Sequence, residues 1–236
     1  MAYKRVLLKI SGEQLAGQFD GGFDGGFATW LAKEISKVLA ESCQVVIMVG
    51  GGNYARGAQL ATHGIKRVTA DFIGMLGTMM NALAVCDVFN NAGVESWALS
   101  SVAANLAIDQ FTHRRASNHL DKGRVVIVAG GIGRPYVTTD TAAVELALEM
   151  DCEVVLKATK VDGVYDKDPV QFADAKKYEH LTFSEVLANN DIRVMDRAAI
   201  GLASDHSLPI IVFNGLQQDN IIQAVRGEPI GTKISH

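Results

Sequence analysis

The sequence has little of what a nucleic-acid-binding or disulfide-stabilised protein requires. The chain of 236 residues carries a formal net charge of -4, whereas proteins that hold DNA or RNA by the backbone usually show a basic excess. We therefore expect no nucleic-acid partner. The three cysteines, Cys43, Cys86 and Cys152, form no C-x-x-C pair. This odd, unpaired set argues against a disulfide framework and against structural zinc, and it fits a reducing compartment.

Long hydrophobic runs are also missing. The longest runs, such as residues 45–49 and 125–129, are far too short to span a membrane. The apolar run at residues 6–10 is interrupted by Lys9 and is too short for the core of a signal peptide. We therefore expect a cytoplasmic protein without a membrane partner. Hydrophobic residues make up 48% of the chain, which is enough to build the core of one large domain or of two closely fused lobes.

Several well-known catalytic motifs are absent as well. The sequence contains no G-x-x-x-x-G-K-[ST], which excludes a P-loop NTPase. It lacks the H-R-D and D-F-G set of eukaryotic-type protein kinases and the G-x-S-x-G turn of serine hydrolases. No His, Cys and carboxylate cluster has the spacing of metal ligands, so we predict no metal-ligating residues.

What the sequence does contain is a regular alternation of short β-branched runs and helical patterns. Strands are predicted at residues 5–10, 44–49, 96–99, 124–129, 154–158 and 209–213. Helices are predicted after the N-cap residue Asp24 and at residues 69–91, 138–150, 184–187, 195–206 and 220–225. Such alternation predicts an α/β fold with a mostly parallel sheet, helices on both faces, and a ligand at the carboxyl ends of the strands.

Glycines and polar residues follow the first two predicted strands. Lys9 lies near the end of a buried strand, where an ammonium group is costly unless it meets an anion. It could neutralise a transferring phosphoryl group, or it could simply reach water. Gly12 lets the backbone approach a ligand closely. The glycines at 50–52 leave N–H groups free to hold oxyanions and Arg56 could add a forked contact, although a plain tight turn is the alternative.

Two later strands end in similar segments. After residues 124–129 the pattern is G-x-G-x-x-Y, because Tyr136 replaces the last glycine of a dinucleotide fingerprint. The threonines at 138–139 could cap a helix or contact a phosphate, and Asp140 could complement a helix dipole. The segment from Lys157 to Pro169, at the end of the strand predicted at residues 154–158, contains two lysines, a glycine turn, an aromatic residue and an Asp-Pro turn. The residues alone therefore indicate a phosphate-handling α/β enzyme.

The combined segments closely resemble bacterial-type UMP kinases of the amino-acid kinase superfamily. The matching stretches are residues 3–13, 49–57, 135–140, 156–165, 194–196 and 208–214. The resemblance implies a three-layer αβα sandwich with a mostly parallel central sheet. It implies one domain, with a UMP-binding lobe at about residues 1–156 and an ATP-binding lobe at about 157–236. It also implies a homohexamer that uses Mg²⁺ with ATP and transfers the γ-phosphoryl reversibly to UMP, in pyrimidine nucleotide (CTP) biosynthesis.

The resemblance also assigns site residues. Those expected along the ATP phosphates are Lys9, Ile10, Ser11, Gly12, Gly52 and Arg56. Those expected around the adenosine are Thr159, Tyr165 and Asp168. Those expected around UMP are Gly51 at the phosphate, Asp71 at the ribose, and Ile132, Gly133, Arg134, Pro135, Tyr136, Val137, Thr138 and Thr139 around the uridine and its phosphate. Lys9, Asp140 and Asp196 are expected to be catalytic, with the two acids orienting Lys9 or a magnesium ion; no general base is assigned.

Three features depart from the family. The segment 17–26 is rich in glycine and Phe-Asp pairs, where the matching loop of the family is linked to allosteric control by GTP. Cys86 stands where an arginine is common, and Arg134 stands where a smaller polar residue is common. GTP and UTP are the effectors that the family suggests. Two other functions stay open: a kinase of the same superfamily acting on a carboxylate, a carbamate or isopentenyl phosphate, and a nucleotide-binding regulatory protein without catalysis.

Overall fold

The computed structural model describes residues 2–62, 64–167, 169, 171–172, 174–189, 191–192 and 194–236. Asp168, predicted to contact adenosine, lies outside the described residues. Within this part the main sheet has nine strands, in the order β4-β3-β5-β2-β1-β6-β10-β11-β9. They are β1 Arg5–Ile10, β2 Gln44–Val49, β3 Ser96–Ser100, β4 Asp109–Gln110, β5 Val125–Ala129, β6 Val155–Thr159, β9 His180–Thr182, β10 Ile210–Asn214 and β11 Thr232–Ser235.

The sheet is mostly parallel, as the sequence predicted. Only β10 and β11 pair antiparallel among the described strands of this sheet. A separate antiparallel pair is formed by β7, Val164–Tyr165, and β8, Lys177–Tyr178. Because the central strands run in one direction, the segments that follow β1, β2, β5 and β6 emerge at the same edge of the sheet.

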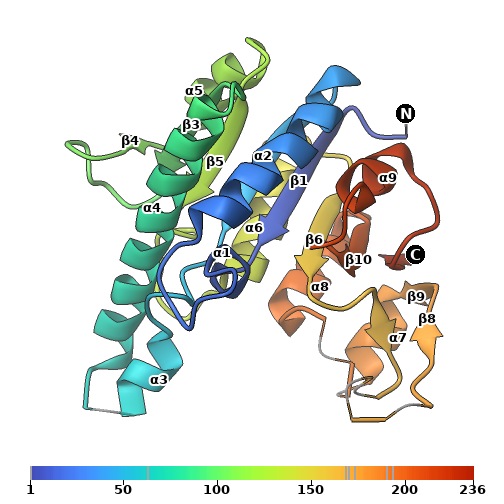
Figure 1. The fold of residues 1–236 in the computed structure, drawn as a ribbon. Coiled ribbons are helices and arrows are strands. Elements are labelled where there is room, and N and C mark those ends of the chain that lie inside the picture. The colour runs from blue at the N-terminus through green and yellow to red at the C-terminus, as the bar shows by residue number, and fades with distance from the viewer. Residues whose placement is uncertain are drawn as a thin grey trace.

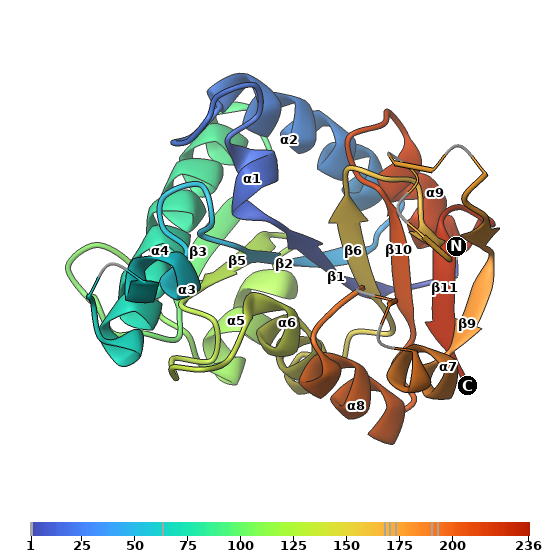
Figure 2. The same ribbon diagram turned by 90° about the horizontal axis from the view of Figure 1, so that it is seen from below.

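Helices cover both faces of the sheet, which gives three layers (Figures 1 and 2). The helices are α1 Gly12–Leu15, α2 Gly25–Ala40, α3 Gly57–Thr62, α4 Arg67–Asn91, α5 His113–Leu120, α6 Thr139–Glu149, α7 Phe183–Ala188, α8 Arg197–Asp205 and α9 Asn220–Arg226. One core lies between the sheet and α2, α4 and α9, and the other lies between the sheet and α5, α6, α7 and α8. The predicted three-layer αβα architecture is therefore present.

Alternation along β1 decides which core each side chain joins. Val6, Leu8 and Ile10 face α2 and α4, whereas Leu7 faces α6. Lys9 is in phase with Leu7, because successive side chains of a strand point to opposite faces. Its side chain therefore lies on the α6 side of the sheet.

The long helix α4 borders the predicted acceptor site. Among the described helices it alone is long and apolar enough to cross a membrane, by length and composition. It belongs to a helix layer of the fold, with Ala82, Val85 and Phe89 fully buried against the sheet. This burial is what a core helix of a globular protein shows.

Candidate active site at the carboxyl ends of the strands

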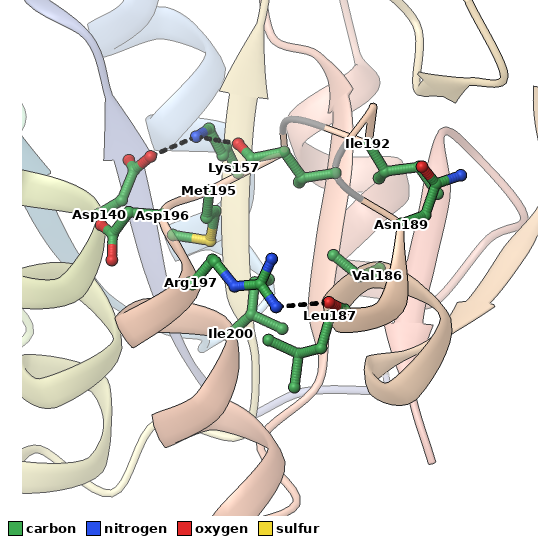
Figure 3. A pocket seen from close by; sticks show the side chains of 11 residues that line it. Asp140, Lys157, Val186, Leu187, Asn189, Ile192, Met195, Asp196, Arg197 and Ile200 are labelled. Atoms are coloured by element: carbon green, nitrogen blue, oxygen red, sulfur yellow. Dashed lines mark hydrogen bonds and ion pairs between the residues drawn. The ribbon is translucent and has the colours of Figure 1, made fainter.

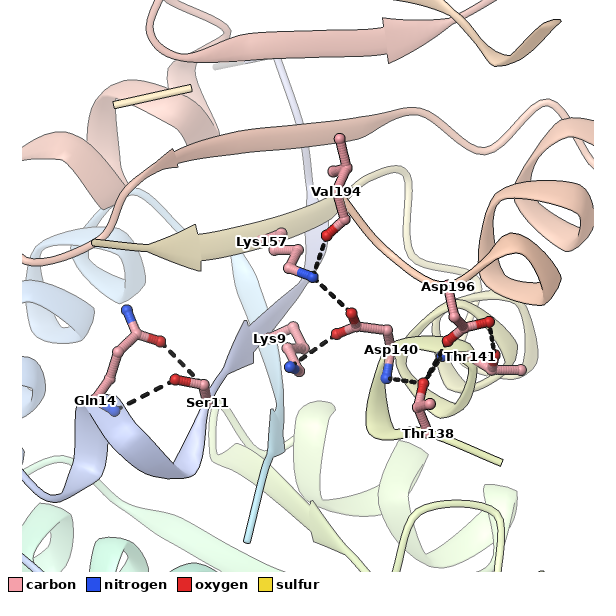
Figure 4. Close-up of polar contacts among 9 residues, drawn as sticks. All are labelled: Lys9, Ser11, Gln14, Thr138, Asp140, Thr141, Lys157, Val194 and Asp196. Atoms are coloured by element: carbon pink, nitrogen blue, oxygen red, sulfur yellow. Dashed lines mark hydrogen bonds and ion pairs between the residues drawn. The ribbon is translucent and has the colours of Figure 1, made fainter. Parts of the chain in front are cut away.

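Two lysines share one carboxylate at the centre of the candidate site (Figure 4). Lys9 on β1 and Lys157 on β6 are register partners on neighbouring parallel strands. The Nζ of Lys9 lies 2.7 Å from Asp140 Oδ1, and the Nζ of Lys157 lies 2.6 Å from Asp140 Oδ2. Lys9 is only 7% exposed. Its buried ammonium thus has the anionic partner that burial demands.

The pKa values of Asp140 and Lys157 both lie below their usual range, but for different reasons. Burial alone would raise the pKa of the Asp140 carboxyl, but the ammonium groups of Lys9 and Lys157 outweigh it and hold that pKa below its usual range. Burial lowers the pKa of Lys157, and the nearby Lys9 lowers it further, against the pull of Asp140. One carboxylate divided between two ammonium groups explains why it is well stabilised while Lys157 is not.

Asp140 is fixed by the start of α6. Thr138 is the N-cap of this helix, and its hydroxyl accepts hydrogen bonds from the N–H groups of Asp140 and Thr141 at 3.1 and 3.3 Å. Asp196, the N-cap of α8, accepts hydrogen bonds from the hydroxyls of both Thr138 and Thr141, the latter at 2.7 Å. Asp196 therefore links α8 to the start of α6, whereas Asp140 contacts Lys9 directly.

Glycines allow the two phosphate-type turns to approach each other. A Cβ added to Gly12 would lie 2.5 Å from the backbone nitrogen of Gly52 and 2.4 Å from Asn53 Oδ1. A Cβ on Gly51 would lie 2.6 Å from the carbonyl oxygen of Gly74 on α4. Since contacts this short do not occur, both positions require glycine, and the turn after β1 abuts the turn after β2.

The turn after β1 is held by a capping box. The side chain of Ser11 accepts a hydrogen bond from the Gln14 N–H at 3.3 Å, and Ser11 N donates to Gln14 Oε1 at 2.9 Å. Ile10 ends β1 as a fully buried core residue. Arg56, also predicted to contact ATP phosphates, forms an ion pair with Glu13. A bound triphosphate would compete with Glu13 for this guanidinium.

A hollow of about 160 Å³ collects many of the residues predicted to bind UMP. Those among its lining residues are Gly51, Asp71, Ile132, Arg134, Val137 and Thr139, together with Gly52. Gly133, Pro135, Tyr136 and Thr138 belong to the same loop but do not line the hollow. Asp71 and Tyr136 are nevertheless in contact, because Tyr136 N donates to Asp71 Oδ2 at 2.8 Å.

A larger hollow of about 580 Å³ lies beside β6 and β7. Thr159 and Tyr165, both predicted to hold adenosine, line it together with Val161, Val194 and Val212. The Tyr165 hydroxyl donates a hydrogen bond to Asp162. The Lys9–Asp140–Lys157 cluster adjoins both hollows, because Thr139, next to Asp140, lines the smaller one and Val194, which accepts a hydrogen bond from Lys157, lines the larger one.

A third hollow, of about 560 Å³, opens beside the same cluster (Figure 3). Asp140, Lys157 and Asp196 form one side of it, and aliphatic side chains of α7 and α8 form the other, including Val186 and Ile200. None of the site residues predicted from the sequence lies on the apolar side of this hollow. The ammonium of Lys157 lies at the edge of this hollow and donates to the carbonyl oxygen of Val194.

Lys157 is the candidate site residue that the sequence did not single out. The sequence marked it only as one of two lysines at the end of a strand, yet the structure gives it the same carboxylate partner as Lys9. A signal was available, because Lys157, like Lys9, follows a run of buried apolar strand residues. The sequence alone could not show that β6 lies beside β1 in the sheet.

A cation that arrives on a nucleotide would find few protein ligands at this cluster. No group of three or more His, Cys, Asp or Glu side chains forms a metal cage in the part of the chain that the structure describes. Asp140 Oδ1 is buried, and the Lys9 ammonium lies 2.7 Å from it. Magnesium bound to nucleotide phosphates needs only one or two protein carboxylates. Both oxygens of Asp140 already face ammonium groups, so such an ion would be held chiefly by the nucleotide phosphates.

Comparison with known proteins agrees with this geometry. The model of the amino acid kinase family matches residues 4–214. A UMP kinase from Bacillus anthracis is 39% identical, with a TM-score of 0.94 over 100% of this chain and 97% of that one. A UMP kinase from Ureaplasma parvum is 31% identical, with a TM-score of 0.92 over 100% of both chains.

A uridylate kinase from Archaeoglobus fulgidus is more distant. It is 27% identical, with a TM-score of 0.75 over 98% of this chain and 99% of that one. All three likenesses run over nearly the full length of both partners, so they concern the whole fold and not one motif. The chain therefore belongs to the amino acid kinase family, and within that family to the group of the UMP kinases.

Proposed function

We propose that this protein is a nucleoside monophosphate kinase that transfers the γ-phosphoryl of ATP reversibly to UMP, giving ADP and UDP. The observation that carries the proposal is the Asp140 carboxylate shared between Lys9 and Lys157, in a cluster that adjoins two hollows of unequal size. The full-length likeness to UMP kinases supports UMP as the acceptor. The reaction would serve pyrimidine nucleotide (CTP) synthesis in the cytoplasm.

The mechanism follows from charge and position. Phosphoryl transfer passes through a loose transition state, so the protein chiefly has to align the partners and neutralise charge. Lys9, oriented by Asp140, would contact the transferring group, and Lys157 would stabilise charge on the same group or on the leaving phosphate. The phosphate of a nucleoside monophosphate is largely dianionic at neutral pH, so no general base is required. Mg²⁺ on the ATP phosphates would screen their negative charge.

The binding roles follow the two hollows. The backbone at Ser11, Gly12 and Gly52 would hold the triphosphate, with Thr159 and Tyr165 at the adenosine. Gly51, Asp71 and the loop 132–139 would hold UMP. This division gives a UMP-binding lobe at about residues 1–156 and an ATP-binding lobe at about 157–236.

Self-association is part of the proposal. Large apolar side chains on the outer face of α4 are exposed, among them Phe72 at 40%, Leu76 at 52% and Met80 at 51%. An exposed apolar stripe of this kind is typical of a protein interface. It supports the homohexamer that the family resemblance suggests. GTP or UTP would act as effector, with GTP the weaker candidate because Cys86 supplies no positive charge.

A coupled assay of ATP consumption tests the acceptor. We expect rapid turnover with UMP and much slower turnover with CMP and dCMP. Turnover with a carboxylate, carbamate or isopentenyl phosphate acceptor in place of UMP would point instead to another kinase of the superfamily. Tight UTP binding without any UDP formation would point to a regulatory protein.

A further inference from the structure

Asp71, the residue proposed to face the ribose of UMP, is held by a neighbour on its own helix. Arg67 lies one turn earlier on α4, and its Nε lies 2.8 Å from Asp71 Oδ1 and 3.0 Å from Oδ2. The Asp71 side chain is 13% exposed, whereas that of Arg67 is 44% exposed. The guanidinium thus fixes the rotation of a carboxylate that lines the smaller hollow.

The same arginine contacts the loop on the other side of that hollow. Its guanidinium carbon lies 5.2 Å from the centroid of the Tyr136 ring, a distance at which a cation and an aromatic face attract. Tyr136 has a φ of +66°, a left-handed conformation that is unusual for a bulky side chain. In this conformation its N–H donates to Asp71 Oδ2 at 2.8 Å. Arg67, Asp71 and Tyr136 therefore form one cluster that ties α4 to the loop.

The cluster leaves Asp71 able to accept further hydrogen bonds. An ionised carboxylate has about four acceptor positions, and the Nε of Arg67 and the N of Tyr136 are the donors that contact it. Gly57 packs against Asp71 Oδ1 without a side chain, since an added Cβ would clash with this oxygen, and both residues line the smaller hollow. The free acceptor positions suit the hydroxyl groups of a ribose.

We propose that Arg67 is a positioning residue for the acceptor nucleotide. It holds the Asp71 carboxylate in the rotation that accepts the 2′-hydroxyl of the ribose. It also holds the Tyr136 ring near that carboxylate. This inference rests on the proposed function. It goes beyond that function by assigning the choice between ribose and deoxyribose to Arg67, which touches no substrate atom itself.

The test compares UMP with dUMP, which lacks the 2′-hydroxyl, in steady-state kinetics. The native protein should prefer UMP. Arg67→Ala should lower kcat/KM for UMP about tenfold, mainly through a higher KM, and should leave dUMP nearly unchanged, so that the preference is lost. Arg67→Lys keeps the charge but lacks the planar fork, so it should recover only part of the preference. It also serves as the measured variant if Arg67→Ala does not fold.

A double substitution makes the test specific. Asp71→Ala should remove the preference for UMP by itself, and Arg67→Ala added to it should change nothing further, because coupled residues are not additive. Arg226→Ala is the matched control, since Arg226 pairs with Glu41 on the surface and lines neither nucleotide hollow. It should leave both nucleotides unaffected.

The outcomes separate this inference from the proposed function. If Arg67→Ala lowered kcat/KM equally for UMP and dUMP, the positioning role would be overturned and Arg67 would have only a structural role. Unchanged kinetics with both nucleotides would overturn it as well. If the native protein makes UDP from UMP, either of these results leaves the proposed function intact. A native protein that makes no UDP would overturn the proposed function together with the inference.

Discussion

Two buried ammonium groups and one carboxylate carry the chemistry at the scale of single residues. Lys9 and Lys157 lie on opposite oxygens of Asp140. The cluster has one excess positive charge, in a place where charge is poorly screened by water. That excess is suited to stabilising the negative charge on the oxygens of the transferring phosphoryl group and on the leaving oxygen.

Removal of Lys9 should affect the chemical step more than binding. We predict that Lys9→Ala lowers kcat about 10²- to 10³-fold, the usual effect of deleting one preorganised stabiliser of transition-state charge. The KM for UMP should change much less. Steady-state kinetics with ATP and UMP measure both constants. Lys33→Ala, an exposed lysine on α2, is the matched control and should retain native kcat. A native kcat in Lys9→Ala would remove Lys9 from the mechanism.

Lys157 should give the activity an alkaline limit. Burial lowers its pKa below the ordinary 10.5 of a lysine, so the ammonium loses its proton, and the site its charge, as pH rises through that lowered value. We predict that kcat falls on the alkaline side before pH reaches 10.5. Lys157→Arg keeps its charge at all these pH values, and its alkaline fall should move to higher pH. A pH profile of kcat compares the two, and superimposable alkaline limbs would contradict the role of Lys157.

At the scale of elements, the sequence predicted those whose side chains enter the core. The strands at residues 5–10 and 44–49 match β1 and β2, because runs of buried β-branched residues specify central strands. The helix predicted at 69–91 begins two residues earlier, at Arg67. Asp24 caps α2 as expected, accepting from the N–H groups of Gly26 and Phe27.

Short or exposed elements were missed, for a physical reason. The helix α5 contains mostly polar residues, and α1 has four residues. Neither leaves a long apolar pattern in the sequence. The pairing of Lys157 with Asp140 was missed because strand order depends on how the crossovers pack and not on local pattern. The site was thus predictable as a set of strand ends, but its mutual contacts were not.

The turn after β1 provides a test at this scale. Gly12→Ala would place a methyl group 2.5 Å from Gly52 N, so the two turns must separate. We predict a loss of stability of about 1–3 kcal/mol, together with a raised KM for ATP. Denaturant unfolding and steady-state kinetics measure the two effects. Gly25→Ala at the start of α2 is the matched control, because an added Cβ there meets nothing within 4 Å. Native stability and native KM in Gly12→Ala would contradict the close approach.

The outer face of α4 matters at the scale of the whole molecule. Its exposed apolar side chains include Phe72, Leu76, Met80 and Leu83, which recur at helical spacing. A monomer that exposed this stripe to water would gain by covering it with a second copy. The sequence predicted the helix but not its uncovered face, since only the folded chain shows which apolar residues the sheet leaves exposed.

A charge on this stripe should weaken assembly. We predict that Leu76→Asp shifts the protein from an oligomer to smaller species, because an interface would have to bury the new carboxylate. Sedimentation velocity measures the distribution at micromolar concentration. Phe172→Asp, at a similarly exposed apolar residue away from α4, should leave the distribution unchanged. An unchanged oligomer in Leu76→Asp would move the interface elsewhere.

The central claim concerns which group this site phosphorylates. The direct measurement follows label from γ-³²P-labelled ATP in the presence of UMP and separates the nucleotide products. We predict labelled UDP from the native protein, and labelled UDP reduced about 10²-fold or more from Lys9→Ala. Labelled phosphate on another acceptor, with none in UDP, would contradict the account.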